Sequence, residues 1–372
     1  MKYVLCLTQR CNLRCGYCYV GKREASMTRS VASKIVDFVY SNTPTEERID
    51  IGFFGGEPLL EFPLMEEITE MIESHPLFDG DRVELALTTN GTIFSEAIAD
   101  FANEHHVIFG ISCDGPPWVH DVYRRFPGGA PSSDVVEETI KRARDAIPTV
   151  RVNSVYHPHT FRYLPQAVDY FSSLGIRQIH LNPDHSANWS KEDTDQLAGV
   201  YDQIAQRYIA YYAQGNPHFI NLIDNKIAVI LRGGYAGIER CRMGRGEYAF
   251  SPEGNIFPCE RLVGDGTENR HCIGNIDDGL ALNRMSCFVA PGESANAECL
   301  SCSLRPYCVN WCGCSNYMST GYYNRVDYFS CVAEKAAIQT AFNVFQTLEE
   351  ALGPTFMGHL SGFPSLYSTV VS

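Results

Sequence analysis

The sequence has no long apolar run and comparatively few basic residues. No stretch approaches the roughly 18 apolar residues of a membrane-spanning helix. Met1–Gln9 has one lysine and lacks the apolar core of a secretion signal. Lys and Arg together number 30 against 44 Asp and Glu, a net charge of −14. Because contacts to a phosphate backbone need clustered Lys and Arg, we expect a cytoplasmic protein with no nucleic-acid and no membrane partner.

Cysteine is the residue in excess, with 15 copies. An odd number in a chain without a secretion signal does not suit a disulfide framework, so metal binding is the better explanation. The chain also lacks a repeat of fixed period. Its 372 residues, 45% of them hydrophobic, are enough for about two domains with a large core.

The first half of the chain alternates short β-like runs with amphipathic stretches, which predicts a parallel sheet with right-handed crossovers. The expected strands are Tyr3–Thr8, Asp50–Phe54, Val83–Thr88, Val107–Ser112, Thr149–Val155 and Gln178–Leu181. The expected helices are Arg29–Tyr40, Leu64–His75, Ser95–Glu104, Ser133–Ala146, Phe161–Leu174, Lys191–Ala213, Asn221–Leu231 and Ala333–Leu352. Between residues 241 and 331 helical periodicity disappears and cysteine becomes dense, which indicates a segment organised by metal.

Three cysteines directly after the first strand carry the strongest chemical signal. Cys11, Cys15 and Cys18 form a CxxxCxxC run with no fourth Cys or His nearby. A structural zinc site needs four closed ligands, and ferredoxin clusters take four thiolates. Three thiolates would hold a [4Fe–4S] cluster with one iron open to a substrate. The alternatives are a zinc knuckle and ordinary reduced cysteines.

This run resembles the motif of the radical S-adenosylmethionine (radical SAM) superfamily, in which an aromatic residue precedes the third cysteine, as Tyr17 does here. The resemblance implies that the open iron binds S-adenosylmethionine, that Tyr17 lies near its adenine, and that the reduced cluster releases a 5′-deoxyadenosyl radical. It also implies an α/β fold, a partial (β/α)6 TIM-like barrel, whose active site lies at the carboxyl ends of the strands.

Further motifs at strand ends resemble landmarks of the same superfamily. Gly55 and Gly56 allow a close backbone approach to a ligand, and with Glu57 they resemble the GGEP motif that takes the amino group of S-adenosylmethionine, with Glu57 supporting the loop. The other cofactor-binding candidates at strand ends are Asn90, Ser112, Asp114 and Asn153. The stretch 120–125 resembles an HDxYR motif and is expected either to line the substrate mouth or to cap a helix.

The cysteine-rich segment resembles the SPASM domain, which carries auxiliary iron–sulfur clusters in radical SAM enzymes that modify peptides and proteins. The resemblance implies domains at 1–232 (barrel with bridging helices), 233–335 (SPASM) and 336–372 (closing helix and tail). It assigns one auxiliary cluster, cluster II, to Cys299, Cys302, Cys308 and Cys331. It assigns the other, cluster I, to Cys241, Cys259 and Cys312. The fourth position of cluster I stays open between a vacancy, Cys314, Cys272 and an oxygen ligand, and zinc is the alternative metal.

Glu260 follows Cys259 and is the candidate catalytic base, because in the anaerobic sulfatase-maturing branch an Asp stands at this position. The alternative is a surface glutamate on a metal loop. The remaining cysteines are expected to be packing residues: Cys6, Cys113, Cys272 and Cys287.

The resemblance implies an oxidoreductase that modifies a ribosomally made precursor peptide, with cyclophane-type carbon–carbon crosslinking of side chains as the favoured reaction. The alternatives are thioether formation, epimerisation, formylglycine generation in a sulfatase, and a non-enzymatic iron–sulfur protein. The expected partners are the precursor peptide and an electron donor such as flavodoxin or ferredoxin. Because Cys11 stands so near the start, no winged-helix leader-binding module is expected ahead of it. The leader would then bind the barrel, the bridging region or a separate protein.

Overall fold

The computed structural model describes residues 1–236, 241, 243–264, 269–285 and 296–361. The chain forms two compact units that interleave in sequence. The first comprises Met1–Cys113, His120–Val150 and the described part of Arg242–Ala290. The second comprises Asp114–Val119, Arg151–Cys241 and the described part of Pro291–Ser372. The predicted domain boundaries at residues 232 and 335 stay predictions.

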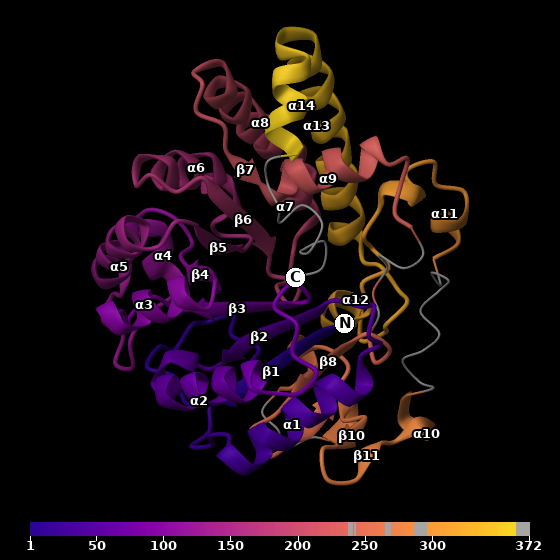
Figure 1. The fold of residues 1–372 in the computed structure, drawn as a ribbon. Coiled ribbons are helices and arrows are strands. Elements are labelled where there is room, and N and C mark those ends of the chain that lie inside the picture. The colour runs from indigo at the N-terminus through magenta and orange to yellow at the C-terminus, as the bar shows by residue number, and fades with distance from the viewer. Residues whose placement is uncertain (237–240, 242, 265–268, 286–295, 362–372) are drawn as a thin grey trace. The chain divides into compact units, whose positions relative to one another are not determined.

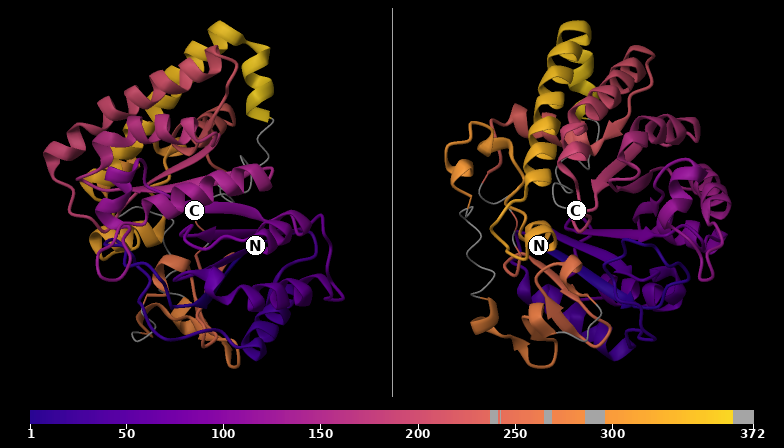
Figure 2. Two further views of the ribbon diagram at one scale, coloured as in Figure 1. Left: turned by 90° about the vertical axis from the view of Figure 1, so that its left-hand side faces the viewer. Right: turned by 180° about the vertical axis from the view of Figure 1, so that it is seen from behind.

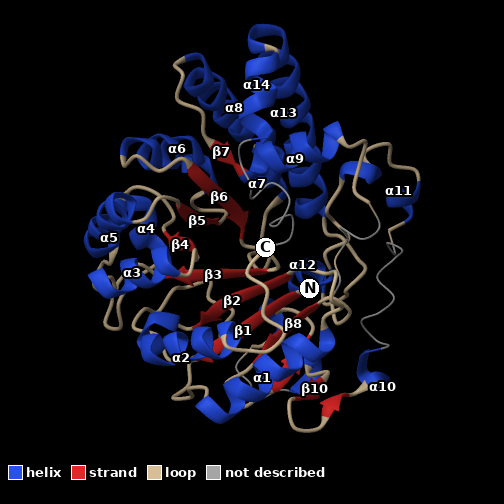
Figure 3. Cartoon of the chain, viewed as in Figure 1, coloured by secondary structure: helices blue, strands red, loops and turns tan. Residues whose placement is uncertain are grey.

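The first unit is built on a mostly parallel sheet (Figures 1 and 3). Its parallel strands lie in the order β1 (Lys2–Thr8), β2 (Ile49–Gly55), β3 (Val83–Thr89) and β4 (Ile108–Ser112). On its other side β1 pairs in parallel with β8 (Glu247–Phe250), with Lys2 opposite Glu247. Antiparallel pairing then continues through β9 (Asn255–Phe257), β10 (Gly274–Asn275) and β11 (Gly279–Leu280). The cysteine-rich half therefore contributes strands to the N-terminal sheet.

Helices follow the parallel strands of this unit. They are α1 (Arg29–Asn42), α2 (Phe62–Glu73), α3 (Glu96–Glu104), α4 (Pro117–Tyr123) and α5 (Ser133–Ala146). α1 begins where the side chain of Thr28 accepts a hydrogen bond from the Val31 amide at 3.3 Å. α1 buries Ile35 and Val39 on one face, and the side chains of β2 alternate between buried and half-buried. The buried face of α1 and the alternating burial of β2 show that the sheet has a covered face. This packing fixes the strand ends that carry the cysteine loop.

The second unit contains the parallel strands β5 (Val150–Tyr156), β6 (Gln178–Pro183) and β7 (Phe219–Ile220). Its helices are α6 (Leu164–Ser173), α7 (Lys191–Asp195), α8 (Leu197–Ala213), α9 (Asn221–Leu231), α11 (Ala297–Leu300), α12 (Gly313–Thr320), α13 (Tyr328–Leu352) and α14 (Pro354–Ser361). The long helix α13 packs along α8 and α9 (Figure 2). The short helix α10 (Leu282–Met285) belongs to the first unit.

The structure confirms the predicted α/β class and all six predicted strands, and it corrects two helices. The stretch predicted as one helix over Lys191–Ala213 is two helices, because the chain turns at Gln196, whose amide bonds to the carbonyls of Asp193 and Thr194. The closing helix starts at Tyr328 instead of Ala333, because the side chain of Asp327 caps it. The described helices include none that is both long and apolar enough to span a bilayer.

Candidate functional site

The cysteine loop follows β1 and is fixed by backbone hydrogen bonds to the segment after α4. The amide of Arg14 donates to the carbonyl of Arg125 at 2.7 Å, and the amide of Gly16 donates to the carbonyl of Tyr123 at 3.0 Å. The ring of Tyr17 lies 5.6 Å from the ring of Tyr123. This pairing leaves Cys11 and Cys15 half-buried and Cys18 exposed.

The sulfur atoms of Cys11 and Cys18 lie near hydrogen-bond donors, which favour thiolates. The Cys11 sulfur accepts from the amide of Leu13 at 3.4 Å and from the side-chain amide of Asn90 at 3.7 Å. Lys22 Nζ lies 3.2 Å from the Cys18 sulfur. Such donors around the ligand atoms orient and tune a metal site.

The spacing of the three sulfurs suits a cluster better than a single zinc ion. In the part of the chain that the structure describes, the sulfurs of Cys11, Cys15 and Cys18 do not all lie within 4.8 Å of one another. Thiolates around one tetrahedral zinc would be about 3.8 Å apart. This spacing does not match one tetrahedral zinc ion, and a [4Fe–4S] cluster held by the three thiolates stays the prediction for the loop.

Gly55 and Gly56 are glycines because the loop after β2 meets the cysteine loop backbone to backbone. A Cβ on Gly56 would lie 2.1 Å from the carbonyl oxygen of Arg10, and one on Gly55 would lie 2.2 Å from that of Thr8. The amide of Gly56 donates to the Thr8 carbonyl at 2.8 Å, and the amide of Glu57 donates to the Arg10 carbonyl at 2.9 Å. These two amides already form hydrogen bonds within the protein. The groups of this loop that can accept from a ligand's amino group are its carbonyls.

The Glu57 side chain is completely buried and ties the second strand end to the third. Its carboxylate accepts from the Leu59 amide at 3.1 Å, from Thr89 Oγ1 at 2.8 Å and from the Asn90 amide at 2.7 Å. Burial raises the pKa of Glu57 to about 7, although these hydrogen bonds favour the charged form. The geometry makes Glu57 a positioning residue behind the loop.

Asn90 belongs to a polar group that sequence reasoning identified only in part. Its side-chain amide donates to Asn12 Oδ1 at 2.9 Å, and its own Oδ1 accepts from Thr92 Oγ1 at 2.6 Å. Asn12 Nδ2 donates in turn to Thr92 Oγ1 at 2.7 Å. The sequence signal for Asn12 was its position next to Cys11. Thr92 lies past the end of its strand, and no sequence signal pointed to it.

A pocket of about 350 Å³ opens beside the cysteine loop, within the usual size range of small-molecule sites. Its lining is rich in basic side chains and consists of Gln9, Arg10, Cys11, Asn12, Arg14, Lys22, Arg23, Glu24 and Leu60. Positive charge next to a cysteine cluster suits an anionic group such as a carboxylate.

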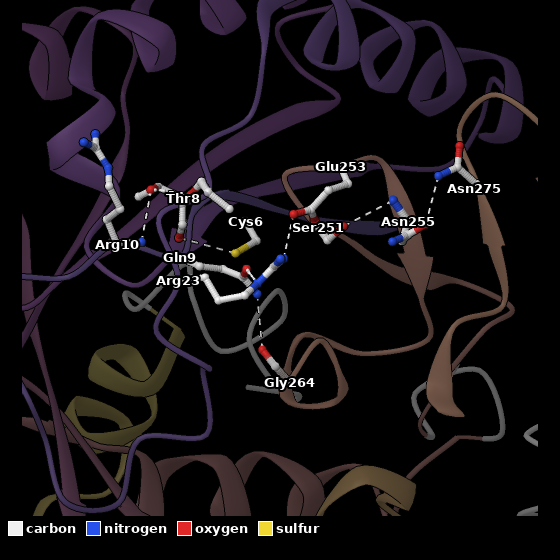
Figure 4. Close-up of polar contacts among 11 residues, drawn as sticks. Cys6, Thr8, Gln9, Arg10, Arg23, Ser251, Glu253, Asn255, Gly264 and Asn275 are labelled. Carbon is white, nitrogen blue, oxygen red and sulfur yellow. Dashed lines mark hydrogen bonds and ion pairs between the residues drawn. The ribbon is translucent and has the colours of Figure 1, made fainter. Parts of the chain in front are cut away.

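Both ends of the cysteine loop are tied to the segments before and after Cys259 (Figure 4). Arg23 donates to Gln9 Oε1 at 2.7 Å and to Glu253 Oε1 at 2.6 Å. Gln9 reaches the carbonyl of Gly264 at 3.4 Å. These contacts fix the ends of the cysteine loop to the segments that precede and follow Cys259 in the sequence.

The remaining polar candidates divide between the two units. Ser112 is half-buried at the end of β4 in the first unit. In the second unit Asp114 is buried, and its carboxylate accepts from the Val155 amide at 2.9 Å, which anchors it to β5. Asn153 is half-buried on β5 opposite His180. Contact of these residues with a cofactor stays a prediction.

The HDxYR-like stretch serves as a scaffold. His120 Nε2 lies 3.0 Å from Ser132 Oγ, and that hydroxyl donates to the Arg124 carbonyl at 2.7 Å. Asp121 accepts from the amides of Ser132 and Ser133 at 3.0 and 3.1 Å, which caps the start of α5. Of the two roles expected for this stretch, the geometry favours the helix cap. The cap also holds the carbonyls that bind the cysteine loop.

Glu260, the predicted base, forms a buried ion-pair group with Lys2 and Glu247. Lys2 Nζ lies 3.4 Å from Glu260 Oε2 and 3.3 Å from Glu247 Oε1, and the side chains of Glu260 and Glu247 are 14% and 7% exposed. Burial opposes ionisation, but the Lys2 ammonium holds the pKa of Glu260 well below its usual range. With its side chain 14% exposed and paired with Lys2, Glu260 is not the solvated surface glutamate of the alternative.

The four predicted ligands of cluster II lie together in the second unit. The thiols of Cys299 and Cys302 are close enough to act electrostatically on Cys331, and Cys331 acts on Cys308. The Cys308 sulfur also accepts from the Asn310 amide at 3.4 Å. These residues fit an iron–sulfur cluster.

The predicted ligands of cluster I are divided between the units: Cys259 lies in the first, Cys241 and Cys312 in the second. The Cys314 sulfur lies 3.5 Å from that of Cys312, closer than two ligands of different irons in one cluster, so the fourth position of cluster I stays open. Cys272 instead donates to the Gly274 carbonyl and packs in an apolar cluster. It is a packing residue, as are the buried Cys6 and Cys113. Cys287 lies outside the described residues.

Comparisons with known proteins agree with this reading. Residues 5–184 match the model of the radical SAM superfamily. An uncharacterized protein of Methanocaldococcus jannaschii is 27% identical over 280 residues, 74% of this chain and 88% of that protein. The cysteine-type anaerobic sulfatase-maturating enzyme of Clostridium perfringens is 23% identical over 332 residues, 81% and 85% of the two chains. The radical SAM cyclopropyl synthase TigE of Paramaledivibacter caminithermalis is 22% identical over 340 residues, 83% and 66%.

Solved structures share the fold. The structure of anSMEcpe with bound AdoMet aligns with a TM-score of 0.79 at 20% identity and covers 97% of this chain and 98% of that one. Streptococcus suis SuiB bound to the precursor peptide SuiA aligns with a TM-score of 0.61 at 15% identity, covering 88% and 75%. The superfamily whose model matches residues 5–184 uses one [4Fe–4S] cluster and S-adenosylmethionine, in agreement with these two predicted cofactors, whereas the two auxiliary clusters stay predictions. The chain contains a radical SAM domain and is a homologue of the anaerobic sulfatase-maturating enzymes.

Proposed function

We propose that this chain is a maturase that oxidatively modifies a ribosomally made precursor peptide, with carbon–carbon crosslinking of side chains as the reaction. The observation that carries the proposal is the cysteine loop, which presents three thiols beside a basic pocket on a superfamily fold. When bound, the cluster and S-adenosylmethionine supply the 5′-deoxyadenosyl radical that removes a hydrogen atom from the peptide. The auxiliary cysteines Cys299, Cys302, Cys308 and Cys331 would hold the acceptor of the remaining electron.

A peptide substrate is supported by what the relatives bind. SuiB was solved with its precursor peptide SuiA, and anSMEcpe was solved with AdoMet and a peptide. TigE is named as a cyclopropyl synthase. We infer that this chain acts on a peptide as well, and that Tyr17, Asn90 and the loop at Gly55 and Gly56 position S-adenosylmethionine.

The Lys2–Glu260 ion pair supports crosslinking over formylglycine formation. The sulfatase-maturing branch places a candidate base at this position, and here that carboxylate is held by a lysine in a buried group. A base engaged in this way would accept a proton only after the pair opens. The proton released with the electron would then pass to another group or to solvent.

Sulfatase maturation is the second candidate, favoured by the names of several relatives. Both candidates share the first step, so the first experiment tests that step alone. The protein, reconstituted anaerobically with iron and sulfide, is incubated with dithionite and S-adenosylmethionine, and 5′-deoxyadenosine is measured. We expect this product from the parent and from Cys6→Ala, whose side chain is buried in β1, but none from Cys15→Ala. Normal cleavage by Cys15→Ala would refute the assignment of the first cluster.

The second experiment identifies the reaction. The chain is co-expressed with the short open reading frame next to its gene, and the peptide is examined by tandem mass spectrometry. A crosslink removes two hydrogens and leaves both joined side chains in one fragment. A peptide of unchanged mass would favour epimerisation. An unmodified peptide together with an oxidised Cys or Ser in a neighbouring sulfatase would favour formylglycine formation.

A further inference from the structure

A buried ion pair lies next to Cys308, one of the predicted ligands of auxiliary cluster II. Lys226 on α9 and Glu334 on α13 contact each other, and their side chains are only 7% and 11% exposed. Both residues belong to the second unit, where α9 and α13 pack together (Figure 1). Two charges withdrawn from water in this way have a high desolvation cost, so their retention calls for a specific reason.

The two side chains form hydrogen bonds with the backbone on both sides of Cys308. Lys226 Nζ donates to the carbonyl of Tyr307 at 3.3 Å, and Glu334 Oε1 accepts from the amide of Val309 at 2.8 Å. Lys226 also lies 5.6 Å from the centre of the Tyr235 ring. Cys308 lies between Tyr307 and Val309, close enough for both charges to act on its thiol, and Glu334 is about one helical turn from Cys331 on α13.

We infer that Lys226 and Glu334 set the reduction potential of the cluster held by Cys308, with opposite signs. The inference deepens the proposed function, because it concerns the cluster that would accept the substrate electron. Reduction adds a negative charge to a thiolate-ligated cluster. A nearby ammonium stabilises that charge and raises the potential, while a nearby carboxylate lowers it. Charge, hydrogen bonding and burial around the ligands are the usual means by which a protein tunes such clusters.

The opposite directions of the expected shifts in reduction potential distinguish this role from a purely structural one. Loss of either partner of a buried pair destabilises the fold in the same direction, whereas the effects on potential should diverge. Lys226→Met removes the positive charge and keeps the length of the side chain. Glu334→Gln removes the negative charge and keeps an oxygen that can accept from the Val309 amide.

The test is redox potentiometry monitored by electron paramagnetic resonance on the anaerobically reconstituted full-length protein, without peptide substrate. Cys308→Ala identifies the signal of cluster II and should lower iron content by one cluster. We expect Lys226→Met to lower the midpoint potential of that signal and Glu334→Gln to raise it, with iron content unchanged in Glu334→Gln. The control variants Lys141→Met and Glu137→Gln, from a more exposed pair on α5, should leave it unchanged.

A Glu334→Gln variant that keeps its iron and shows an unchanged or lower potential would overturn the inference. If Lys226→Met loses the cluster, Glu334→Gln still decides the question. If Cys308→Ala left the iron content and every signal unchanged, Cys308 would not be a cluster ligand, and the premise of the inference would fail. An unchanged or lower potential in Glu334→Gln would leave the proposed reaction standing, because that reaction is measured separately on the peptide product.

Discussion

Single residues near the cysteine loop are constrained most tightly where two backbones touch. Gly56 lies against the carbonyl of Arg10 with no space for a methyl group. Its conformation does not demand glycine, since no left-handed φ is found there, so the constraint is purely steric. The glycine pair thus brings the loop after β2 against the cysteine loop and aligns Cys11 with Asn90.

Gly56→Ala should displace the cysteine loop. The added Cβ forces the Arg10 carbonyl away and weakens the hydrogen bonds from the Gly56 and Glu57 amides, at a cost of roughly 1–3 kcal/mol. We expect a lower midpoint in urea and the loss of most iron from the first cluster. Gly80→Ala is the control, because its Cβ would meet only Phe78 at an ordinary 3.8 Å. Equal iron content in the two variants would show that the close approach is not needed.

Asp224 should make stability depend on pH. It is buried and accepts from Tyr208 and from the Ile220 amide, both at 2.7 Å, and burial raises its pKa to about 7. A carboxyl that holds its proton more tightly in the folded state loses stability as pH rises from its ordinary pKa to the raised one. Asp224→Asn should therefore match the parent near pH 4 and exceed it by roughly 2–4 kcal/mol at pH 8.

Anaerobic urea unfolding at several pH values measures this difference. Burial lowers the pKa of His180 to about 3 and that of His218 to about 4, so these histidines have the opposite effect and remove stability as pH falls below about 6.5. They are present in both proteins, so their contribution cancels when variant and parent are compared. A difference that stays constant across pH would contradict the raised pKa of Asp224.

Among the elements, α4 and α5 do the most to hold the cysteine loop. α4 ends at Tyr123, and the carbonyls of Tyr123 and Arg125 bind the loop amides. Asp121 joins the end of α4 to the start of α5. The position of the loop therefore depends on a helix cap that makes no contact with a cofactor.

Asp121→Ala should lower stability and loosen the cluster. Loss of the cap costs on the order of 1–2 kcal/mol, and release of the Tyr123 and Arg125 carbonyls should speed the loss of iron to a chelator severalfold. Ser95→Ala removes the comparable cap of α3, where the Ser95 hydroxyl accepts from the Ile98 amide at 3.3 Å. It should cost similar stability without changing iron release. Equal iron release from both variants would mean that the cap does not reach the cluster.

The parallel strands and the amphipathic helices could be predicted because their signals are local. β2 alternates in burial, and Asn221–Leu231 was predicted with its observed bounds. α4 was missed because it is short and exposes Trp118 and Val122, so it has no apolar stripe. The network of Asn12, Asn90 and Thr92 depends on partners far apart in sequence, which residue spacing does not encode.

The whole molecule combines three sets of cysteines on two interleaved units. The pairing of β1 with β8 and the Lys2–Glu260 contact join residues about 250 positions apart. No periodicity in the sequence predicts such contacts, whereas the cysteine spacings predict clusters, because metal chemistry restricts the spacing of ligands. The sequence was therefore most informative about chemistry and least informative about long-range packing.

Iron analysis tests the molecule as a whole. Three [4Fe–4S] clusters would give about 12 iron atoms per chain, and replacing Cys308 should leave about 8. Replacing Cys272, which is packed among apolar side chains, should leave the count unchanged. A parent protein with about 8 iron atoms would mean that one auxiliary site is absent or holds a smaller cluster.

The pairing of β1 with β8 also sets an order of events during synthesis. Lys2 and Glu247 are partners across 245 residues, and at 5–20 residues per second the ribosome needs roughly 12–50 s to make the second after the first. During that interval β1 and the cysteine loop exist in the nascent chain while one edge of β1 is unpaired. Such an edge can recruit other strands. The N-terminal sheet therefore stays incomplete at β1 until β8 of the C-terminal half has been made.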